Sequence, residues 1–208
     1  MTQRVTQPFV AWPGWRHLRY AALWTLLVNA LFAVVYFGTD FLTARRATRL
    51  HLFVPQELEL PLWPAAILLY DSLYLLFLLA PFVLRTRESF RALAAGAIAA
   101  IVIAGACFLL LPAELGFAAP RVEGPFRAIF TASDAVNLDY NLVPSLHVAL
   151  ATLCLLAFRP AASLPVRIAL AAWGLALAAS TLLTHQHHLL DVVAGAALAL
   201  GVRRLHGG

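Results

Sequence analysis

The stretch RALAAGAIAAIVIAGACFLLLP, residues 91–112, carries one charged side chain, Arg91, and that residue stands at its start. A helix needs about 20 consecutive apolar residues to cross the hydrocarbon core of a bilayer. The stretch meets this length, and its alanines and glycines favour close contact with neighbouring helices. The sequence therefore predicts a membrane-spanning helix here.

Five further apolar runs occur at residues 18–38, 62–84, 142–158, 163–183 and 188–205. The chain as a whole is 62% hydrophobic and 12% charged, a composition far outside that of soluble domains. We expect an all-α bundle of six transmembrane helices, which forms a single integral membrane domain over residues 1–208. The fourth and sixth runs along the chain are short and begin with polar residues, which indicates that their first turns line a pocket.

The arginines predict the orientation of this bundle. All fifteen basic residues are arginine, and ten of them fall on the side that the two termini share, where Glu88 is the only acid. By the positive-inside rule, we expect both termini to be cytoplasmic. The loops before the fourth and sixth helices then face the exterior, which is the periplasm if the chain lies in a bacterial inner membrane, as we expect. This topology accounts for the net charge of +5, so no nucleic-acid partner is expected.

Polar residues with chemical potential stand at the start of the fourth and sixth helices. Ser145 and His147 belong to VPSLH, and a histidine cluster occurs in STLLTHQHHLLDVVAG, residues 180–195. His187 and Asp191 are four residues apart, so on a helix their side chains can meet. A carboxylate bonded to one imidazole nitrogen leaves the other nitrogen available as a nucleophile or base. We expect the two histidines to converge just below the outer surface.

Together these motifs resemble those of the type 2 phosphatidic acid phosphatase superfamily, whose members are six-helix membrane enzymes. The resemblance rests on residues 141–195 and, elsewhere, on topology. The wording YNLVPSLHVALAT with QHHLLDVVAG is most similar to the branch that includes the inositol phosphorylceramide synthases.

The resemblance implies metal-independent phosphoryl transfer through a phosphohistidine, without a cofactor. His187 would attack phosphorus, Asp191 would orient it, and His147 would protonate the departing alkoxide. Ser145, with the N-terminal N–H groups of its helix, would bind phosphate oxygens, and Ser180 would belong to the substrate site. The partner would be a lipid phosphate or a phospholipid. Hydrolysis, head-group transfer to a lipid alcohol and lipid binding without catalysis all stay open.

The sequence also departs from the superfamily pattern. Members usually have a lysine, an arginine-proline six residues later, and an arginine directly after the serine of the last motif. This chain has no lysine, and Thr181 occupies the last of those positions. Because a phosphate dianion needs compensating charge, candidates to supply it are Arg121, Arg127, protonated His147, and His185 or His188. The loss of cations favours a substrate with one negative charge, such as a phosphodiester.

Other interpretations of the polar residues remain at this point. His147 and His187 are possible axial ligands of a haem iron. A zinc site built from His185, His187 and His188 is disfavoured, because adjacent helical residues point about 100° apart. Asp71, near the middle of the second helix, is expected either to hydrogen-bond a tyrosine or a helix terminus, or to form a polar floor to the substrate cavity.

Overall fold

The computed structural model describes residues 8–205, which form an all-α protein with no β-strand among them. The helices are α1 (Trp15–Thr43), α2 (Ile67–Val83), α3 (Arg87–Leu110), α4 (Arg127–Asp134), α5 (Leu146–Phe158), α6 (Leu164–Leu183) and α7 (Leu189–Leu205). Three short 3₁₀ turns join them: η1 (Pro55–Glu59), η2 (Pro64–Ala66) and η3 (Arg159–Ala161).

Each apolar run of the sequence coincides with one helix, so the all-α prediction is confirmed. By length and composition, α1, the segment Pro64–Val83, α3 and α6 are able to cross a membrane. Helices α5 and α7 are shorter than these, and the count of six spans stays a prediction.

Two details differ from the sequence-based expectation. Helix α1 continues beyond residue 38 to Thr43, and α4 forms in a segment that was expected to be a loop. Helix α4 is too short and too polar to be found by hydrophobic length. It is held instead by Phe130, which is buried against Ile67 and Tyr70 of α2.

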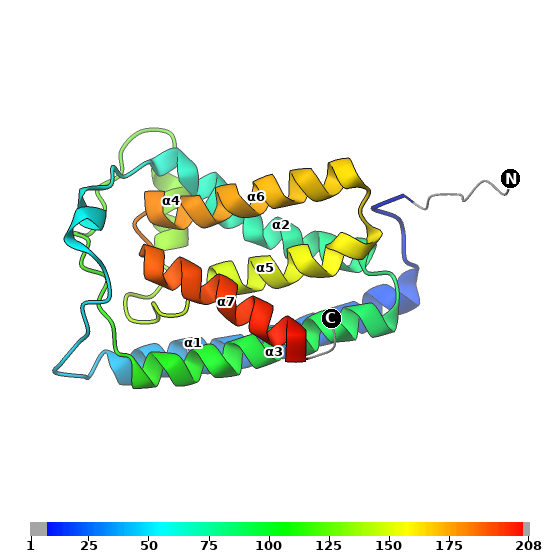
Figure 1. Cartoon of the computed structure of the whole chain (residues 1–208), viewed down its shortest axis with the longest axis horizontal. Coiled ribbons are helices and arrows are strands. Elements are labelled where there is room, and N and C mark those ends of the chain that lie inside the picture. Colours follow the sequence, from blue (N-terminus) through cyan, green and yellow to red (C-terminus); the bar gives the residue numbers. More distant parts are fainter. Residues whose placement is uncertain (1–7, 206–208) are drawn as a thin grey trace, which may run out of the picture.

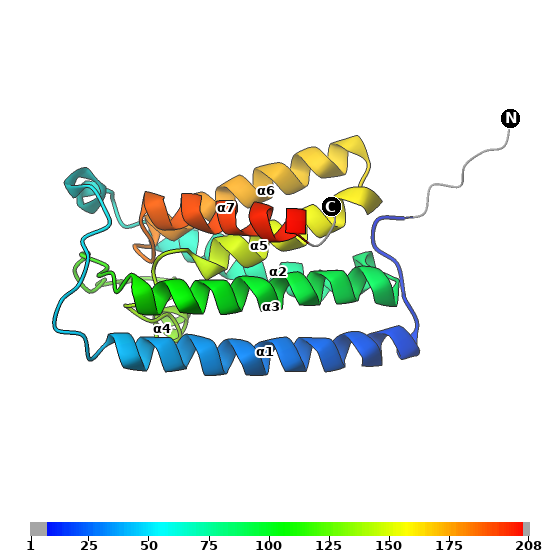
Figure 2. The same ribbon diagram turned by 60° about the horizontal axis from the view of Figure 1, so that its bottom comes forward.

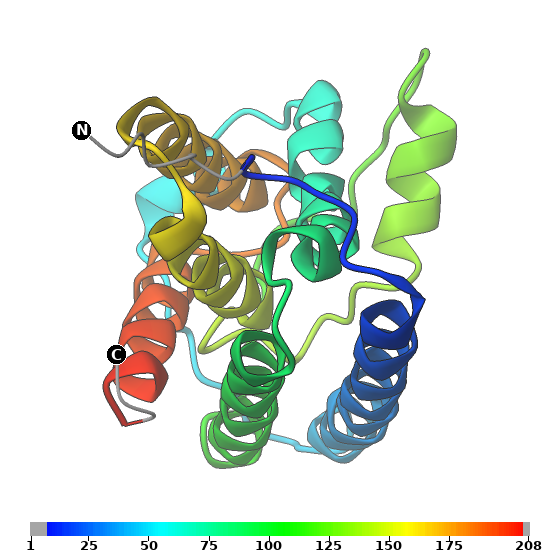
Figure 3. The same cartoon turned by 90° about the vertical axis from the view of Figure 1, so that its right-hand side faces the viewer.

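Helix α5 lies at the centre of the bundle, with α2, α3, α6 and α7 around it (Figure 3). It is apolar on all sides, which is the pattern of a helix that buries every face. Helix α1 lies on the outside and packs along α3 (Figure 2). The core between the helices contains fully buried side chains such as Leu76, Ile101, Phe108 and Phe158.

The two ends of the bundle differ in character. Successive long helices run in alternating directions, so the described ends of the chain lie toward the same end of the bundle (Figure 1). The opposite end carries the starts of α5 and α7 and is covered by residues 44–66 and 111–145. We call it the loop-covered end. The cytoplasmic position of the termini stays a prediction.

Candidate active site

The start of α7 holds a histidine against a carboxylate. Asp191 Oδ2 lies 3.2 Å from His187 Nδ1 and accepts a second hydrogen bond, of 2.8 Å, from the backbone N–H of His188. The side chains of His187 and Asp191 are only 9% and 2% exposed. Because a carboxylate can only accept, Nδ1 of His187 carries a hydrogen and Nε2 keeps its lone pair. The arrangement therefore leaves Nε2 as the nitrogen of His187 that is available for reaction.

His147 lies in the first turn of α5 and is held by Tyr70 of α2. Its Nε2 lies 2.9 Å from the backbone oxygen of Tyr70, and its ring stacks on the Tyr70 ring at a centroid distance of 3.9 Å. A carbonyl oxygen can only accept, so Nε2 of His147 donates this hydrogen bond. Nδ1 is then the nitrogen that can exchange a proton with another molecule.

Direct backbone contact joins the starts of α5 and α7. The N–H of Ser145 donates to the backbone oxygen of Asp191 over 2.9 Å. Gly195, one turn further along α7, faces the backbone carbonyl of Ser145 so closely that a Cβ atom would collide with it. This close approach fixes the first turn of α5, with His147, beside the turn that carries His187.

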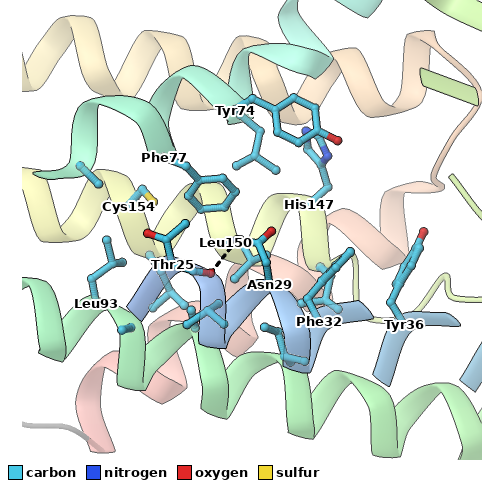
Figure 4. Close-up of a pocket in the computed structure, with 18 of the residues that line it drawn as sticks. Thr25, Asn29, Phe32, Tyr36, Tyr74, Phe77, Leu93, His147, Leu150 and Cys154 are labelled. Atoms are coloured by element: carbon cyan, nitrogen blue, oxygen red, sulfur yellow. Dashed lines mark hydrogen bonds between the residues drawn. The ribbon is translucent and has the colours of Figure 1, made fainter. Parts of the chain in front are cut away.

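His147 and His187 line the same cavity, which has a volume of about 180 Å³. Its walls come from α1, α2, α3 and α5 and are mainly apolar. Figure 4 shows side chains from these walls, among them Phe32, Phe77, Leu93, Leu150 and Cys154, with His147 near one end. A pair of histidines thus opens into an apolar space inside the bundle.

Neutral polar residues also line this cavity, and the sequence had not indicated their role. The hydroxyl of Tyr70 donates to Asn137 Oδ1 at 2.9 Å, and the amide of Asn141 donates to the backbone oxygen of Tyr36 at 2.6 Å. Asn141 lies close to the VPSLH motif in the sequence, and this position could have indicated a place at the site. The other three residues find their partners far away in the chain, so no local pattern reveals them.

The remaining residues expected at the site do not line the cavity. Arg121 and Arg127 are exposed, do not line the cavity, and make no side-chain hydrogen bond or ion pair within residues 8–205. Ser145 is fully buried and caps α5, with its Oγ accepting from the N–H of Val148 at 3.3 Å. Ser180 is buried and its hydroxyl donates to a backbone oxygen of its own helix, α6. The structure therefore brings together His147, His187 and Asp191, but not the two arginines.

A family model described as the PAP2 superfamily matches residues 50–205, three quarters of the chain. The chain belongs to the PAP2 superfamily. No curated protein and no solved structure matches it. Membership suggests lipid phosphatase or phosphotransferase activity in general terms.

The match to the PAP2 superfamily covers only part of the cavity. Helices α2 to α7, with both histidine motifs, lie within the matched residues, whereas α1 lies outside them. Yet α1 supplies one wall of the cavity, through residues from Trp24 to Tyr36. Both histidines therefore lie within the matched residues, while one wall of the space beside them lies outside the match.

A loop clamps the start of α7 from outside. Glu57 of η1 accepts hydrogen bonds from the backbone N–H groups of Leu189, at 2.7 Å, and Val54, at 3.1 Å, and its carboxylate lies 3.3 Å from His188 Nδ1. Burial of the carboxylate opposes its charge, but these hydrogen bonds outweigh burial and lower the pKa of Glu57. His188 Nε2 also donates to the backbone oxygen of Leu115. The loop-covered end is thus tied to the start of α7 through Glu57 and His188.

Aromatic rings complete this clamp. His188 is stacked between Phe53 and Phe117, at centroid distances of 4.4 and 4.6 Å. Phe117 stacks in addition on His185, whose Nε2 donates to the backbone oxygen of Leu60 at 2.9 Å. His185 and His188 therefore bind the covering loops and not the cavity.

The three histidines near α7 do not converge, because each ring turns to a different partner. Within residues 8–205, no three His, Cys, Asp or Glu side chains come together as a metal site. Asp71 accepts a hydrogen bond from Ser133 of α4 at 2.8 Å and does not line the cavity. The partner of Asp71 is thus a serine in the last turn of α4 and not a tyrosine, and Asp71 does not form a floor of the cavity.

Proposed function

We propose that the protein is a membrane enzyme that cleaves or transfers the phosphate group of a lipid through a phosphohistidine on His187. One observation carries the proposal: a histidine oriented by a buried carboxylate and a second histidine line the same apolar cavity. Membership of the PAP2 superfamily supports lipid phosphate chemistry. The apolar walls suit a lipid tail, whose burial beside the histidines would place the phosphate between them.

The reaction would proceed in two steps. In the first, the lone pair of His187 Nε2 forms a bond to phosphorus while the bond from phosphorus to the lipid oxygen breaks. His147, protonated on both nitrogens, gives its Nδ1 proton to the departing alkoxide, and Asp191 stabilises the positive charge on His187. In the second step, water or an alcohol attacks the phosphohistidine and returns a proton to His147. His187 is then released unchanged.

The acceptor in the second step divides two candidate activities. Water would make the protein a lipid phosphatase. A lipid alcohol would make it a head-group transferase, and the likeness of YNLVPSLHVALAT and QHHLLDVVAG to the inositol phosphorylceramide synthases favours this second candidate. A lipid-binding protein without turnover is the remaining outcome, since the arginines usual in the superfamily are absent from the cavity wall.

A lipid panel tests the proposal. Purified protein would be incubated with phosphatidate, phosphatidylglycerophosphate, an isoprenyl diphosphate and phosphatidylglycerol, each with and without an acceptor alcohol and in the presence of a chelator. We expect turnover of at least one lipid and a loss of about 10³-fold or more in H187A. Full activity of a folded H187A protein, or lipid binding with no turnover, would contradict the proposal.

We further propose that the loop-covered end faces the exterior of a bacterial inner membrane, which the distribution of arginines supports. Labelling of introduced cysteines in intact cells with a membrane-impermeant maleimide would test this orientation. Glu123→Cys, in the exposed loop before α4, should react in intact cells, and Ser163→Cys, at the other end, only after permeabilisation. The reverse pattern would contradict the orientation.

A further inference from the structure

The polar end of the cavity lacks a permanently charged cation. The chain has no lysine, and no arginine occurs among the described residues that line the cavity. Apart from His147 and His187, the nitrogen and oxygen groups there are neutral: the amides of Asn137 and Asn141 and the hydroxyls of Tyr36, Tyr70 and Tyr74. A phosphate held in this space would meet neutral hydrogen-bond donors and the two histidines, of which His147 carries the extra proton in the proposed mechanism.

Among these groups, Asn137 has an unused donor. Its Oδ1 accepts from the Tyr70 hydroxyl, but its Nδ2 is buried and has no hydrogen-bond partner among the described residues. A buried amide N–H without an acceptor is unfavourable, so such groups are rare unless a ligand supplies the acceptor. Asn137 lines the cavity, so a bound phosphate oxygen is a suitable acceptor.

Tyr70 places this amide on the same side of the cavity as the proposed acid. Its hydroxyl holds Asn137, its backbone oxygen holds His147 Nε2, and its ring stacks on the His147 ring. One residue of α2 therefore sets the positions of both groups. The unpaired amide and His147 are thus arranged around a common space.

We propose that Asn137 binds a phosphate oxygen in a site suited to one negative charge, and that the lipid substrate is a phosphodiester. This inference rests on the proposed function. A phosphate monoester carries close to two charges at neutral pH and needs fixed cations when it is partly dehydrated, whereas a diester carries one. Neutral donors together with a single protonated histidine balance one charge.

The chemistry follows from the diester. His187 Nε2 forms a bond to phosphorus, and the bond from phosphorus to the oxygen of the diacylglycerol breaks. That oxygen takes the proton of His147 and leaves as an alcohol. The phosphate with its head group stays on His187 until an acceptor hydroxyl attacks phosphorus and gives its own proton to His147. The charge on the bound phosphate therefore never exceeds what one histidine can balance.

Two lipids with the same tails test the inference. Turnover of dioleoyl phosphatidylglycerol, a diester, and dioleoyl phosphatidate, a monoester, would be compared at pH 7.5 in mixed micelles. We expect kcat/KM to favour the diester by about tenfold or more. Asn137→Asp keeps an acceptor for Tyr70 but removes the amide donor and adds a negative charge, so it should lose about 100-fold or more on the diester. Asp139→Asn, at an exposed position of the same loop, should stay within about twofold.

A further variant changes the charge of the site without disturbing the fold. Val136 lines the cavity but is 48% exposed, so Val136→Arg can add the missing cation at low structural cost. We expect it to raise turnover of phosphatidate relative to the diester several-fold, with unchanged thermal unfolding. Preference of the wild-type protein for phosphatidate, or undiminished turnover in N137D, would overturn the inference.

The proposed function and the inference about Asn137 can fail separately. If H187A still turns over the diester, the proposed function fails. If activity needs His187 but N137D is as active as the wild type, only the inference fails. If neither lipid is turned over, binding of the radiolabelled lipids to immobilised protein decides the inference. The inference requires that the wild-type protein binds phosphatidylglycerol more tightly than phosphatidate. It also requires that N137D binds phosphatidylglycerol more weakly than the wild type does. Equal binding in either comparison would overturn the inference.

Discussion

In the proposed mechanism, a single hydrogen bond decides which ring nitrogen of His187 attacks phosphorus. Asp191 Oδ2 accepts from Nδ1 and from the N–H of His188, so the carboxylate is held from two sides and the ring cannot readily turn over. The neighbouring His147 is held in the opposite sense, through Nε2. In this geometry one ring has Nε2 available for phosphorus and the other has Nδ1 available for the leaving oxygen.

Asp191→Asn tests the orientation of His187. The asparagine amide can donate to Nδ1, which then must accept, so the hydrogen moves to Nε2 and the lone pair that attacks phosphorus is lost. We expect kcat to fall by about 10²-fold or more, measured on the best lipid of the panel. The same amide nitrogen cannot accept from the N–H of His188, which Oδ2 accepts in the wild type, so thermal unfolding in detergent measures the accompanying loss of stability and separates it from the loss of kcat. Wild-type activity of D191N would contradict the role of the carboxylate.

Local spacing explains why some site residues could be predicted and others not. His187 and Asp191 lie four apart on one helix, so their contact follows from helical geometry. Asn137 and Tyr70 meet across 67 residues, and the stack of Tyr70 on His147 is equally nonlocal. Arg121 and Arg127 are predicted as phosphate-binding residues from their charge and position in the chain. Neither property shows that both side chains are exposed.

Among the elements, the long helices follow from the sequence because hydrophobic length is a property of the chain itself. The ends of these helices and the short helical elements cannot be predicted in this way. Helix α4 exists because Phe130 is buried against α2, and η1 is held where Glu57 reaches the start of α7. Both depend on contacts between distant segments.

Glu57→Gln tests the clamp between η1 and α7. The carboxylate caps the first turn of α7, so its loss should lower the free energy of unfolding by about 1 kcal/mol at pH 7. Because the pKa of Glu57 is lowered in the fold, its charge stabilises the protein above its ordinary pKa, and this contribution is lost as pH falls through the lowered value. Thermal unfolding of wild type and variant should therefore converge in acid.

Glu59→Gln is the matched control for the clamp, since Glu59 lies in the same turn but is exposed. It should leave the unfolding temperature nearly unchanged at every pH. A difference between E57Q and wild type that stays constant from pH 7 down to strong acid would show that the charge of Glu57 is not what stabilises α7.

Gly195→Ala tests the contact between α5 and α7. The added Cβ would meet the backbone carbonyl of Ser145, which cannot move without its helix, so the two helix starts must separate. We expect a loss of about 1–3 kcal/mol in stability and a clear drop in kcat, because His147 moves relative to His187. Gly201→Ala, on the same helix but facing open space, should be neutral or stabilising. Equal behaviour of the two variants would contradict the argument.

For the whole molecule, the cavity links the loop-covered end to the other half of the bundle. On α1 its lining extends from Tyr36 back to Trp24, a distance of about 18 Å at helical rise, and on α3 from Ile101 back to Phe90. This length exceeds half of a hydrocarbon core of about 30 Å. We therefore expect a lipid tail to lie in this space, along the direction of the helices.

Ala94→Phe tests whether the tail occupies this space. Ala94 of α3 is buried and lines the cavity far from His147, near the end where α3 begins, so a phenyl ring there would shorten the cavity and leave the histidines untouched. We expect kcat/KM for a dioleoyl substrate to fall about tenfold or more, while that for the dihexanoyl analogue stays within about twofold. Ala106→Phe, exposed on the same helix, should affect neither lipid. Equal losses on the long and the short lipid would mean that the tail lies outside the bundle, and the cavity would then have no part in choosing the substrate.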